Sequence, residues 1–349
     1  MGGRNGQDDG ARDRRVKAVI APGFGEGWTI GERPDPVPGP DQVLISVEAS
    51  GICFTDVQQL REPVYGCTFP RVPGHEVVGT VVELGSGMDY LAIGDRVGVA
   101  FAQEWCGRCA HCALGRYHQC VVAKGTGLTM DGGHAEQAVF SAGAVEKLPD
   151  GLDPVEAAPV FCAGFTVYSG LRDAELRPGE RCAVIGLGGL GHLGIQYAAA
   201  IGAEVIAVTR STTKARQARE LGAEHTLVVE PERAGEELRR LGGVDVIVHA
   251  GNGIAQGLHL GLRPYGRLSL VGVSKDTISF TPTELCFGNL RVVGSTQGPR
   301  TWLREVLELH RRCRAKTIVE TYSLDDALSA FDRVVSGEAT FRAVLVPNH

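Results

Sequence analysis

Aromatic residues are sparse in this chain of 349 residues, since Phe, Trp and Tyr together make up only 6% of it. An excess of positive charge is absent too, because 41 acidic residues outnumber 35 basic ones and the formal net charge is −6. Nucleic acids and anionic membranes attract basic surfaces, and single-stranded bases stack on aromatic side chains. The composition therefore argues against both kinds of partner.

The chain also lacks a long uninterrupted hydrophobic run. Its most apolar stretch, residues 183–208, is broken by glycines and polar side chains, whereas a membrane-spanning helix needs about 20 predominantly apolar residues. Residues 1–15 are polar, so we expect a disordered tail there rather than a signal peptide. These features predict a cytoplasmic protein, and structural disulfides are rare in that compartment. The ten cysteines therefore indicate metal binding or catalysis.

Four of the cysteines lie in one short segment, WCGRCAHCALGRYHQC. They follow the spacing C-x2-C-x2-C-x7-C and are Cys106, Cys109, Cys112 and Cys120. Short loops of this kind allow four thiolates to surround one tetrahedral metal ion, and the complete shell leaves no position for substrate or water. We therefore predict a structural zinc in a lobe of about residues 104–121, with His111 and His118 outside the ligand set.

A reactive metal centre requires other ligands, and three separate segments supply candidates. The segments GICFTD, PGHE and PVFCAGFTVY carry Cys53, His75 and Cys162. Two cysteines and one histidine give zinc three protein ligands and leave a fourth position open for a substrate oxygen. Each segment alone is weak evidence, because a buried cysteine is usually only a small hydrophobic residue. We expect that simpler role for Cys67, Cys182, Cys286 and Cys313.

Residues 181–214 have the pattern of a dinucleotide-binding unit. A short apolar strand leads into the turn GLGGLG, whose glycines are Gly186, Gly188, Gly189 and Gly191. A helical pattern follows up to Ala200, and a second apolar strand covers residues 205–208. A glycine-rich turn between strand and helix lets the backbone approach a pyrophosphate at the positive end of the helix. The segment therefore predicts a nicotinamide dinucleotide as cofactor.

The residues after the second strand indicate which dinucleotide binds. An acidic residue there would bind the ribose 2′-hydroxyl of NAD, but this chain has Thr209, Arg210, Ser211 and Lys214. Two cations and two hydroxyls suit a 2′-phosphate, so we predict NADP(H) in preference to NAD(H). The alternative is that the two cations are ordinary solvated charges.

Later segments continue the alternation of strands and helices. Apolar runs at 244–251, 266–273 and 290–295 predict buried parallel strands, and residues 210–223 and 253–262 predict helices between them. This part of the chain is therefore expected to form an α/β domain with a doubly wound parallel sheet.

In this order the motifs resemble those of the zinc-dependent medium-chain dehydrogenase/reductase family, in its alcohol dehydrogenase and cinnamyl-alcohol-dehydrogenase-like branches. The resemblance extends from about residue 17 to residue 347 and includes GDRV, DGGHAE and GEATFRAVL besides the segments above. It implies a β-rich GroES-like catalytic domain of residues 16–155 and 296–349. It also implies a Rossmann domain of residues 156–295.

The resemblance further implies roles for individual residues. Cys53, His75 and Cys162 would bind a catalytic zinc, so that each chain would hold two zinc ions. Glu76 would lie beside this zinc or serve as a fourth ligand when substrate is absent. Asp56 would hydrogen-bond His75, and Thr55 would transfer the alcohol proton. Cofactor contacts are implied for Thr166, Leu190, Val271, Val273 and Arg342, the last at the pyrophosphate. For these five, ordinary packing or surface charge is the alternative.

Two positions depart from the family pattern. Many relatives carry His or Arg directly after the first zinc cysteine, where this chain has Phe54, and a His at the position of Gln58. Glutamine cannot act as a base near neutral pH, which weakens the proton relay for alcohol oxidation. We therefore expect an NADP(H)-dependent reductase of an aldehyde or ketone. The alternatives are a reductase of imines or conjugated C=C bonds, and a non-catalytic NADPH-binding protein.

The substrate would be a small alcohol or carbonyl compound that the sequence does not specify. Phe101 and Ala102, just before the cysteine lobe, either face it or belong to the core. By analogy with the family we expect a homodimer, with a tetramer as the alternative. Its contact is expected at the edge of the Rossmann sheet, around Leu268 to Phe280.

Overall fold

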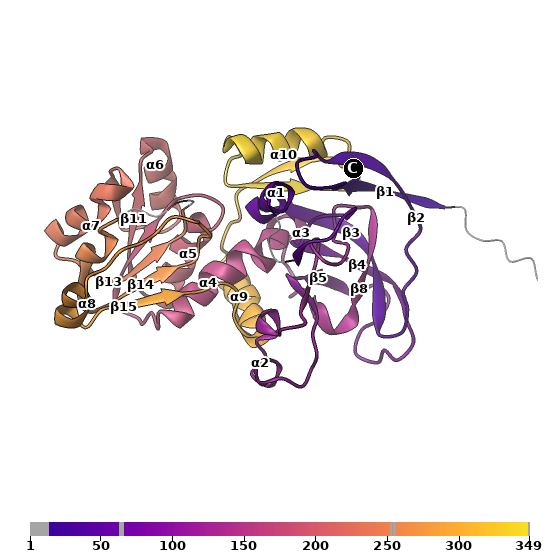
Figure 1. Ribbon diagram of the computed structural model, residues 1–349, viewed down its shortest axis with the longest axis horizontal. Coiled ribbons are helices and arrows are strands. Elements are labelled where there is room, and N and C mark those ends of the chain that lie inside the picture. The colour runs from indigo at the N-terminus through magenta and orange to yellow at the C-terminus, as the bar shows by residue number, and fades with distance from the viewer. Residues whose placement is uncertain (1–13, 63–65, 252, 254–255, 348–349) are drawn as a thin grey trace, which may run out of the picture.

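The computed structural model describes residues 14–62, 66–251, 253 and 256–347, so most of the predicted N-terminal tail lies outside the described residues. Figure 1 shows two lobes, with helices α4 (Ala163–Asp173) and α9 (Arg300–Arg312) at their junction. One lobe contains both ends of the described chain, and the middle of the chain forms the other. No helix among the described residues is long and apolar enough to cross a membrane.

The first lobe is built on a sheet in which distant parts of the chain pair with one another. Its strand order is β16-β17-β3-β4-β5-β9, and β8 also pairs with β3. The strands are β3 (Gln42–Ile52), β4 (Val77–Leu84), β5 (Arg96–Val99), β8 (Gln137–Ser141), β9 (Val145–Lys147), β16 (Val319–Tyr322) and β17 (Arg342–Leu345). Every second residue of β3, from Val43 to Val47, is buried in the core of this lobe. The antiparallel pairing of β17 with β3 sets Ala343 opposite Ile52, at the entrance to the Cys53 segment.

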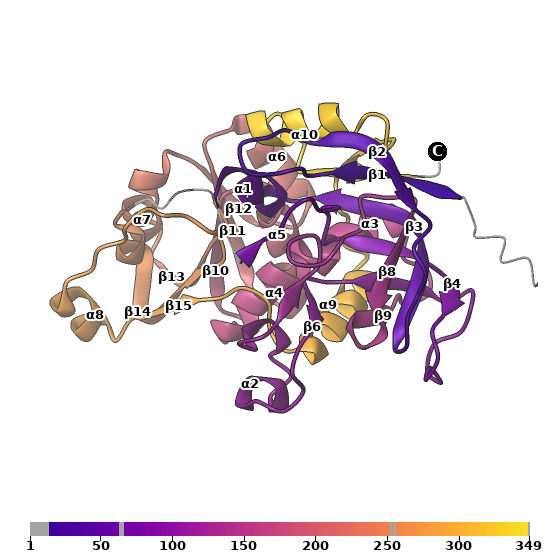
Figure 2. The same ribbon diagram turned by 45° about the vertical axis from the view of Figure 1, so that its right-hand side comes forward.

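Shorter elements complete the first lobe. The strands are β1 (Arg15–Ile20) with β2 (Thr29–Pro34), and β6 (Ala102–Glu104) with β7 (Lys124–Gly125). The helices are α1 (Phe54–Arg61), α2 (Ala110–Ala113), α3 (Pro154–Ala157) and α10 (Ala327–Ser336), with 3-10 turns at Tyr117–Gln119, Ala142–Ala144 and Ala158–Phe161. The cysteine lobe around α2 projects away from both sheets in the two views (Figure 1, Figure 2).

The second lobe is a parallel sheet with the strand order β12-β11-β10-β13-β14-β15. Its strands are β10 (Arg181–Ile185), β11 (Glu204–Thr209), β12 (His225–Val228), β13 (Val244–His249), β14 (Leu262–Leu270) and β15 (Arg291–Gly294). The order reverses between β10 and β13, and the carboxyl ends of strands at such a point form the usual ligand crevice of this architecture. The predicted α/β fold with a doubly wound sheet is thus confirmed.

Helices cover this sheet on both faces, namely α5 (Gly191–Ile201), α6 (Thr212–Glu220) and α7 (Pro231–Arg240), together with α4, whereas α8 (Pro282–Gly288) has no buried residue and projects at the far end (Figure 2). Successive residues of β10 belong to different cores: Cys182 and Val184 pack with α4 and α5, and Ala183 and Ile185 pack with α7. Because both faces are buried, the strand is continuously apolar instead of alternating with polar residues.

Several sequence expectations were wrong in detail. The helix expected over 253–262 is, where described, only a 3-10 turn at Leu258–Gly261, because it follows Gly257 at a φ of 77°. Helix α7 was not anticipated, although Pro231 stands in its first turn, a common helix start. Cys286 and Cys313 are exposed instead of buried, since they lie at the ends of surface helices.

Leu268 was expected in an edge strand of this sheet, and that position was wrong. Leu268 lies in β14, which pairs with β13 on one side and β15 on the other, and its side chain is fully buried. Among the described strands, β15 and β12 are the edges of this sheet, because β15 continues the order by one strand beyond β14.

Candidate active site and metal centres

The three predicted catalytic ligands come together from separate elements. Cys53 precedes α1, His75 precedes β4, and Cys162 precedes α4. Their ligand atoms and a carboxylate oxygen of Glu76 all lie within 4.8 Å of one another. The sulfur atoms of Cys53 and Cys162 are 3.9 Å apart. Two sulfurs and one imidazole nitrogen form a donor set that suits zinc, so these residues fit the predicted catalytic metal.

The electrostatics of this cluster favour a bound cation. The thiol of Cys162 donates to Cys53 and, with the charges of His75 and Arg342, holds the pKa of Cys53 well below its ordinary value. The same contact, together with burial, raises the pKa of Cys162 well above its ordinary value. Burial raises the pKa of Glu76 to about 7, although Arg342 opposes the shift. A metal requires thiolates, so its binding would release any proton that the two sulfurs still carry.

Asp56 contacts two of the predicted metal ligands, Cys53 and His75. Its Oδ2 accepts a hydrogen bond from the backbone N–H of Cys53 at 2.9 Å, and its Oδ1 lies 3.5 Å from Nδ1 of His75. Burial lowers the pKa of His75, but the charges of Asp56 and Cys53 outweigh it and raise the pKa well above its ordinary value. Because Asp56 faces Nδ1, the other ring nitrogen, Nε2, remains for a metal.

The remaining residues of the predicted site lie around this cluster. The hydroxyl oxygen Oγ1 of Thr55 lies 3.6 Å from Sγ of Cys53. The ring of Phe101 stands edge-on to His75 at 6.1 Å between centroids. Ala102 lines a pocket with Trp105, Tyr117, Phe165, Gln297 and Leu303. Phe165 lies one helical turn from Cys162, so this mainly apolar pocket adjoins the segment that carries the third ligand.

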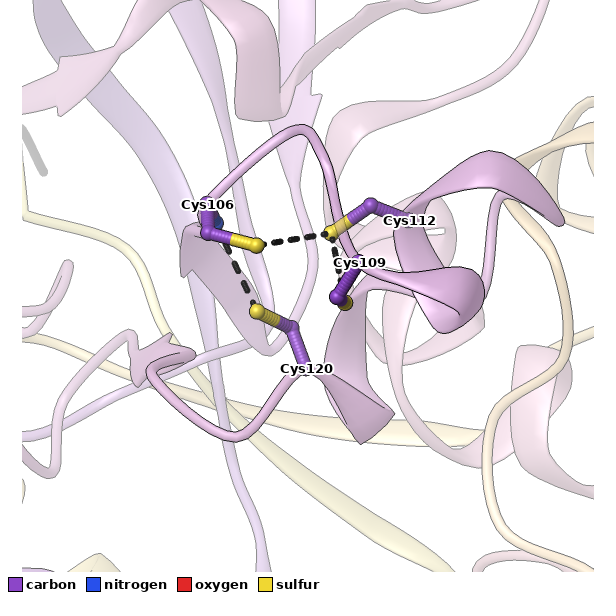
Figure 3. A group of neighbouring side chains, drawn as sticks. All are labelled: Cys106, Cys109, Cys112 and Cys120. Carbon is purple, nitrogen blue, oxygen red and sulfur yellow. Dashed lines mark hydrogen bonds between the residues drawn. The ribbon is translucent and has the colours of Figure 1, made fainter.

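The four-cysteine lobe forms a second cluster (Figure 3). One Sγ atom from each of Cys106, Cys109, Cys112 and Cys120 lies within 4.8 Å of the others. The sulfur of Cys112 is 3.5 Å from that of Cys109 and 3.9 Å from that of Cys106. Backbone N–H groups of Arg108 and Cys109 lower the pKa of Cys106 to about 6, which favours the thiolate that zinc binds. His111 is exposed, and neither it nor His118 belongs to the cluster.

The glycine-rich turn lies at the carboxyl end of β10 and leads into α5. Gly186 has a φ of 91°, and a Cβ there would lie 2.6 Å from the backbone nitrogen of Gly251. A Cβ on Gly191 would lie 2.1 Å from the carbonyl oxygen of Gly186, whereas Gly188 faces open space. Two glycines therefore permit the tight turn, and a third leaves room for a ligand at the N-terminus of α5.

The residues predicted to select NADP(H) lie at the end of β11 and the start of α6. Oγ of Ser211 caps α6 by accepting from the N–H of Lys214 at 3.3 Å, and Oγ1 of Thr209 accepts from the N–H of Ser211 at 3.1 Å. Both hydroxyl protons stay available to donate. Burial and the neighbouring charge of Arg210 lower the pKa of Lys214. In the part of the chain that the structure describes, neither Arg210 nor Lys214 forms an ion pair, which leaves both cations for an anion.

The other predicted cofactor residues lie on different elements and differ in how deeply they are buried. Thr166 lies on α4, one turn from Cys162, and Leu190 directly precedes α5. Val271 is buried against α4, because a Cβ on Gly170 would lie 2.3 Å from its Cγ1, whereas Val273 is half exposed. Arg342 is buried, and its Nη2 contacts Glu76. A Cβ on Gly189 would lie 2.7 Å from Nη1 of Arg342, so the guanidinium also borders the glycine-rich turn.

One buried residue beside this site was not predicted from the sequence. His134, in the motif DGGHAE, lies 3.9 Å from Asp56 through its Nε2. Its motif was part of the family pattern, but nothing in its spacing relates it to Asp56, because the two belong to segments that only the folded chain brings together.

Comparisons with known proteins find relatives that match most of the chain. Residues 39–150 match the family model "Alcohol dehydrogenase GroES-like domain", and residues 189–312 match "Zinc-binding dehydrogenase". An alcohol dehydrogenase of Geobacillus stearothermophilus is 35% identical over 337 residues, covering 95% of this chain and 99% of that protein.

Solved structures with the same fold include a cinnamyl alcohol dehydrogenase from Sorghum bicolor, with a TM-score of 0.87 and 28% identity over 95% of this chain and 98% of that one. A putative zinc-binding dehydrogenase from Sinorhizobium meliloti, crystallised with NADP, has a TM-score of 0.85 and 30% identity over 96% of this chain and all (100%) of the other.

Proposed function

Because this chain belongs to the zinc-binding alcohol dehydrogenase family, we propose that it transfers a hydride between NADP(H) and an alcohol or carbonyl compound, with aldehyde or ketone reduction as its main direction. The observation that carries the proposal is the convergence of Cys53, His75 and Cys162 within 4.8 Å. In the reduction, a hydride and a proton add across C=O, so that carbonyl, NADPH and H⁺ become alcohol and NADP⁺.

The metal and the cofactor would supply the central chemistry: a zinc ion at this site provides a Lewis acid for the substrate oxygen, and NADP(H) provides the hydride. Cys53, His75 and Cys162 would hold the metal, and Asp56 would keep the His75 ring oriented. Thr55, whose hydroxyl lies beside Cys53, would exchange a proton with the substrate oxygen. Phe101 and the apolar pocket next to Ala102 would exclude water from an apolar part of the substrate.

The preference for NADP(H) is supported by two observations. Arg210 and Lys214 stand at the strand end where NAD-specific enzymes carry an acidic residue. The related structure from Sinorhizobium meliloti was solved with NADP bound. The matching test measures KM for NADPH and NADH with a common carbonyl substrate, and a clear preference for NADH would contradict the proposal.

The four-cysteine lobe is proposed to bind a second, structural zinc, so that the chain would hold two zinc ions. Its complete set of thiols leaves no coordination position for substrate. We also propose a cytoplasmic location, because cysteines that are grouped for metal binding suit a reducing compartment. For the assembly we propose a homodimer, with its contact moved from the expected region around Leu268 to Phe280 to the edge strand β15, and light scattering would measure its mass.

The substrate class is best tested with a panel of compounds. Aldehydes, ketones, imines and enals would be supplied with NADPH, and its oxidation would be followed by absorbance. Turnover of carbonyl compounds supports the proposal. Turnover of only the imines or enals would favour the alternative reductase, and no turnover with two zinc ions bound would contradict catalysis by this site.

A further inference from the structure

The motif DGGHAE contains a buried histidine to which the proposed reaction assigns no role. The side chain of His134 is fully buried, and its Nδ1 lies 2.8 Å from the hydroxyl oxygen of Ser50 on β3. Its Nε2 has no hydrogen-bond partner among the described residues and faces Oδ2 of Asp56 at 3.9 Å, which is longer than a hydrogen bond. An unpartnered buried nitrogen that faces a carboxylate calls for a physical explanation.

The backbone around His134 is joined to the segment that carries His75. The N–H of His134 donates to the carbonyl of Pro73 at 3.0 Å, and the N–H of Gly133 donates to the carbonyl of Gly74 at 2.9 Å. Gly74 has a φ of 96°, and a Cβ there would lie 2.4 Å from Nδ1 of His134. The motifs DGGHAE and PGHE therefore form one structural unit in which the His134 ring occupies the space beside Gly74.

The polar groups around the ring favour one tautomer. Burial lowers the pKa of His134 to about 4, so its imidazole is neutral at pH 7. If Nδ1 carried the proton, the Nε2 lone pair would face a carboxylate oxygen, which is repulsive. If the Ser50 hydroxyl donates to Nδ1, then Nε2 carries the proton and its N–H points toward Asp56. The second arrangement is electrostatically favourable.

Asp56 is thereby surrounded by N–H groups on several sides. It faces the backbone N–H of Cys53 at 2.9 Å, the backbone N–H of Gly74 at 3.4 Å and Nδ1 of His75 at 3.5 Å. The Nε2–H of His134 is a further N–H group that faces Asp56. The edge-on ring of Trp28, 5.2 Å from the imidazole between centroids, limits movement of the His134 ring.

We propose that His134 is a positioning residue of the catalytic metal site. Ser50 orients the ring of His134, His134 holds Asp56 in place, and Asp56 orients His75 toward the other ligands. The inference rests on the proposed metal site and extends it to a residue that touches neither metal nor substrate. Partners of metal ligands typically change metal affinity by about 10–100-fold when they are replaced.

The test compares zinc retention in the full-length, zinc-loaded protein and its variants. His134→Phe keeps the ring volume but removes both nitrogens, and His134→Gln keeps an amide that can reach toward the Nε2 position. His310→Phe, on α9, is the matched control, because the side chain of His310 is also buried and, among the described residues, hydrogen-bonds only to Tyr197, with Nδ1 and Oη 2.9 Å apart. Chelator competition measures the affinity of each zinc, and the zinc of the four-cysteine lobe reports whether the fold is intact.

Because His134 acts through Asp56, we expect His134→Phe to weaken one zinc by about tenfold, the lower end of this range, while the other is retained, with partial recovery in His134→Gln and no change in His310→Phe. Cobalt substituted at the weakened site should show an altered visible spectrum, which a merely destabilised fold would not produce. Equal zinc release from His134→Phe and the unmodified protein would overturn the inference.

Two further outcomes are informative. If His134→Phe does not fold, Ser50→Ala decides, because it keeps the imidazole and removes only the hydroxyl: selective loss of one zinc supports the inference, and unchanged retention overturns it. If the unmodified protein binds a single zinc, at the four-cysteine lobe, the proposed metal site itself fails and the inference with it. The variants and the unmodified protein therefore separate the two failures.

Discussion

Arg342 and Glu76, which are 266 positions apart in the sequence, form a buried ion pair in which one guanidinium nitrogen contacts both carboxylate oxygens. The same nitrogen lies 3.3 Å from the carbonyl oxygen of Ile52, the residue before Cys53. The pair exists because β17 lies beside β3 in the sheet, and it joins the proposed metal site to the glycine-rich turn at Gly189.

Removing Arg342 should destabilise the protein strongly. Arg342→Met leaves Glu76 buried without a partner, and breaking a buried pair costs about 3–5 kcal/mol. Because the pKa of Glu76 is already raised to about 7, the carboxyl can take up a proton, and we expect a loss near the lower limit of that range. Urea denaturation measures it. Adding Glu76→Gln to Arg342→Met should restore part of the stability, whereas simple additivity of the two losses would contradict the pairing.

Variants of the two cysteine-containing clusters should each lose a different zinc ion in a metal analysis. Cys162→Ala should lose one of two zinc ions and at least about 100-fold in turnover, because the Lewis acid contributes several kcal/mol to catalysis. Cys109→Ala should lose the other ion and lower the melting temperature, with turnover retained by the folded fraction. Metal content is measured by mass spectrometry on the purified variants. Loss of turnover without loss of zinc in Cys162→Ala would speak against its role as ligand.

Replacing the two cations at the start of α6 should change the cofactor preference. Arg210→Ala and Lys214→Ala should each raise KM for NADPH by about tenfold or more, because a charge-assisted hydrogen bond to phosphate contributes about 1.5–3 kcal/mol. KM for NADH should stay unchanged, since NADH lacks the phosphate. Arg219→Ala, two turns further along α6, is the control. A parallel rise of both KM values would indicate a structural effect instead of phosphate recognition.

Gln58 should limit alcohol oxidation. Gln58→His introduces a group that can accept a proton near neutral pH, so we expect the oxidation rate to rise by about tenfold, within the range of general base catalysis. The pH–rate profile should gain an apparent pKa close to that of histidine. Reduction with NADPH serves as the reference. An unchanged oxidation rate would show that the missing histidine is not the limitation.

Acid should destabilise the protein in part through Glu320. Arg333 donates to both oxygens of this carboxylate and, with Tyr322 and Thr340, lowers its pKa to about 2 from an ordinary value of 4.5. Between these values the unfolded chain binds a proton that the folded chain does not, so stability falls as the pH falls from about 4.5 to about 2. Glu320→Gln should therefore lose less stability over this interval in urea titrations at several pH values. Parallel losses in both proteins would refute the assignment.

Glu320 also anchors the segment that leads to Arg342. Its Oε1 accepts from the N–H of Thr340 at 2.9 Å, and Phe341 follows with a φ of 60°, an unusual value for a residue with a side chain. This turn directs Arg342 into the first lobe. The terminal segment GEATFRAVL was identified in the sequence as part of a family pattern. The direction of the Arg342 side chain, however, depends on the pairing of β17 with β3.

What the sequence determined by itself is local. The four cysteines of the zinc lobe lie within sixteen residues, so their spacing alone brings four sulfurs near one point. The glycine-rich turn and the apolar strands of the parallel sheet can also be predicted from the sequence, because their patterns involve only residues that are neighbours in the chain. The helix over 253–262 was predicted wrongly, because Gly257 ends the pattern at a positive φ that residue type alone does not reveal.

What only the tertiary structure decided are the contacts between distant segments. Residue identity named Cys53, His75 and Cys162 as candidate ligands, yet their convergence depends on how β3, β4 and α4 pack. The ion pair of Arg342 with Glu76 and the approach of His134 to Asp56 carry no signal in spacing. The physical reason is that an apolar strand can satisfy its hydrogen bonds with many partners, and only packing of the whole chain selects the pairing that sets these side chains face to face.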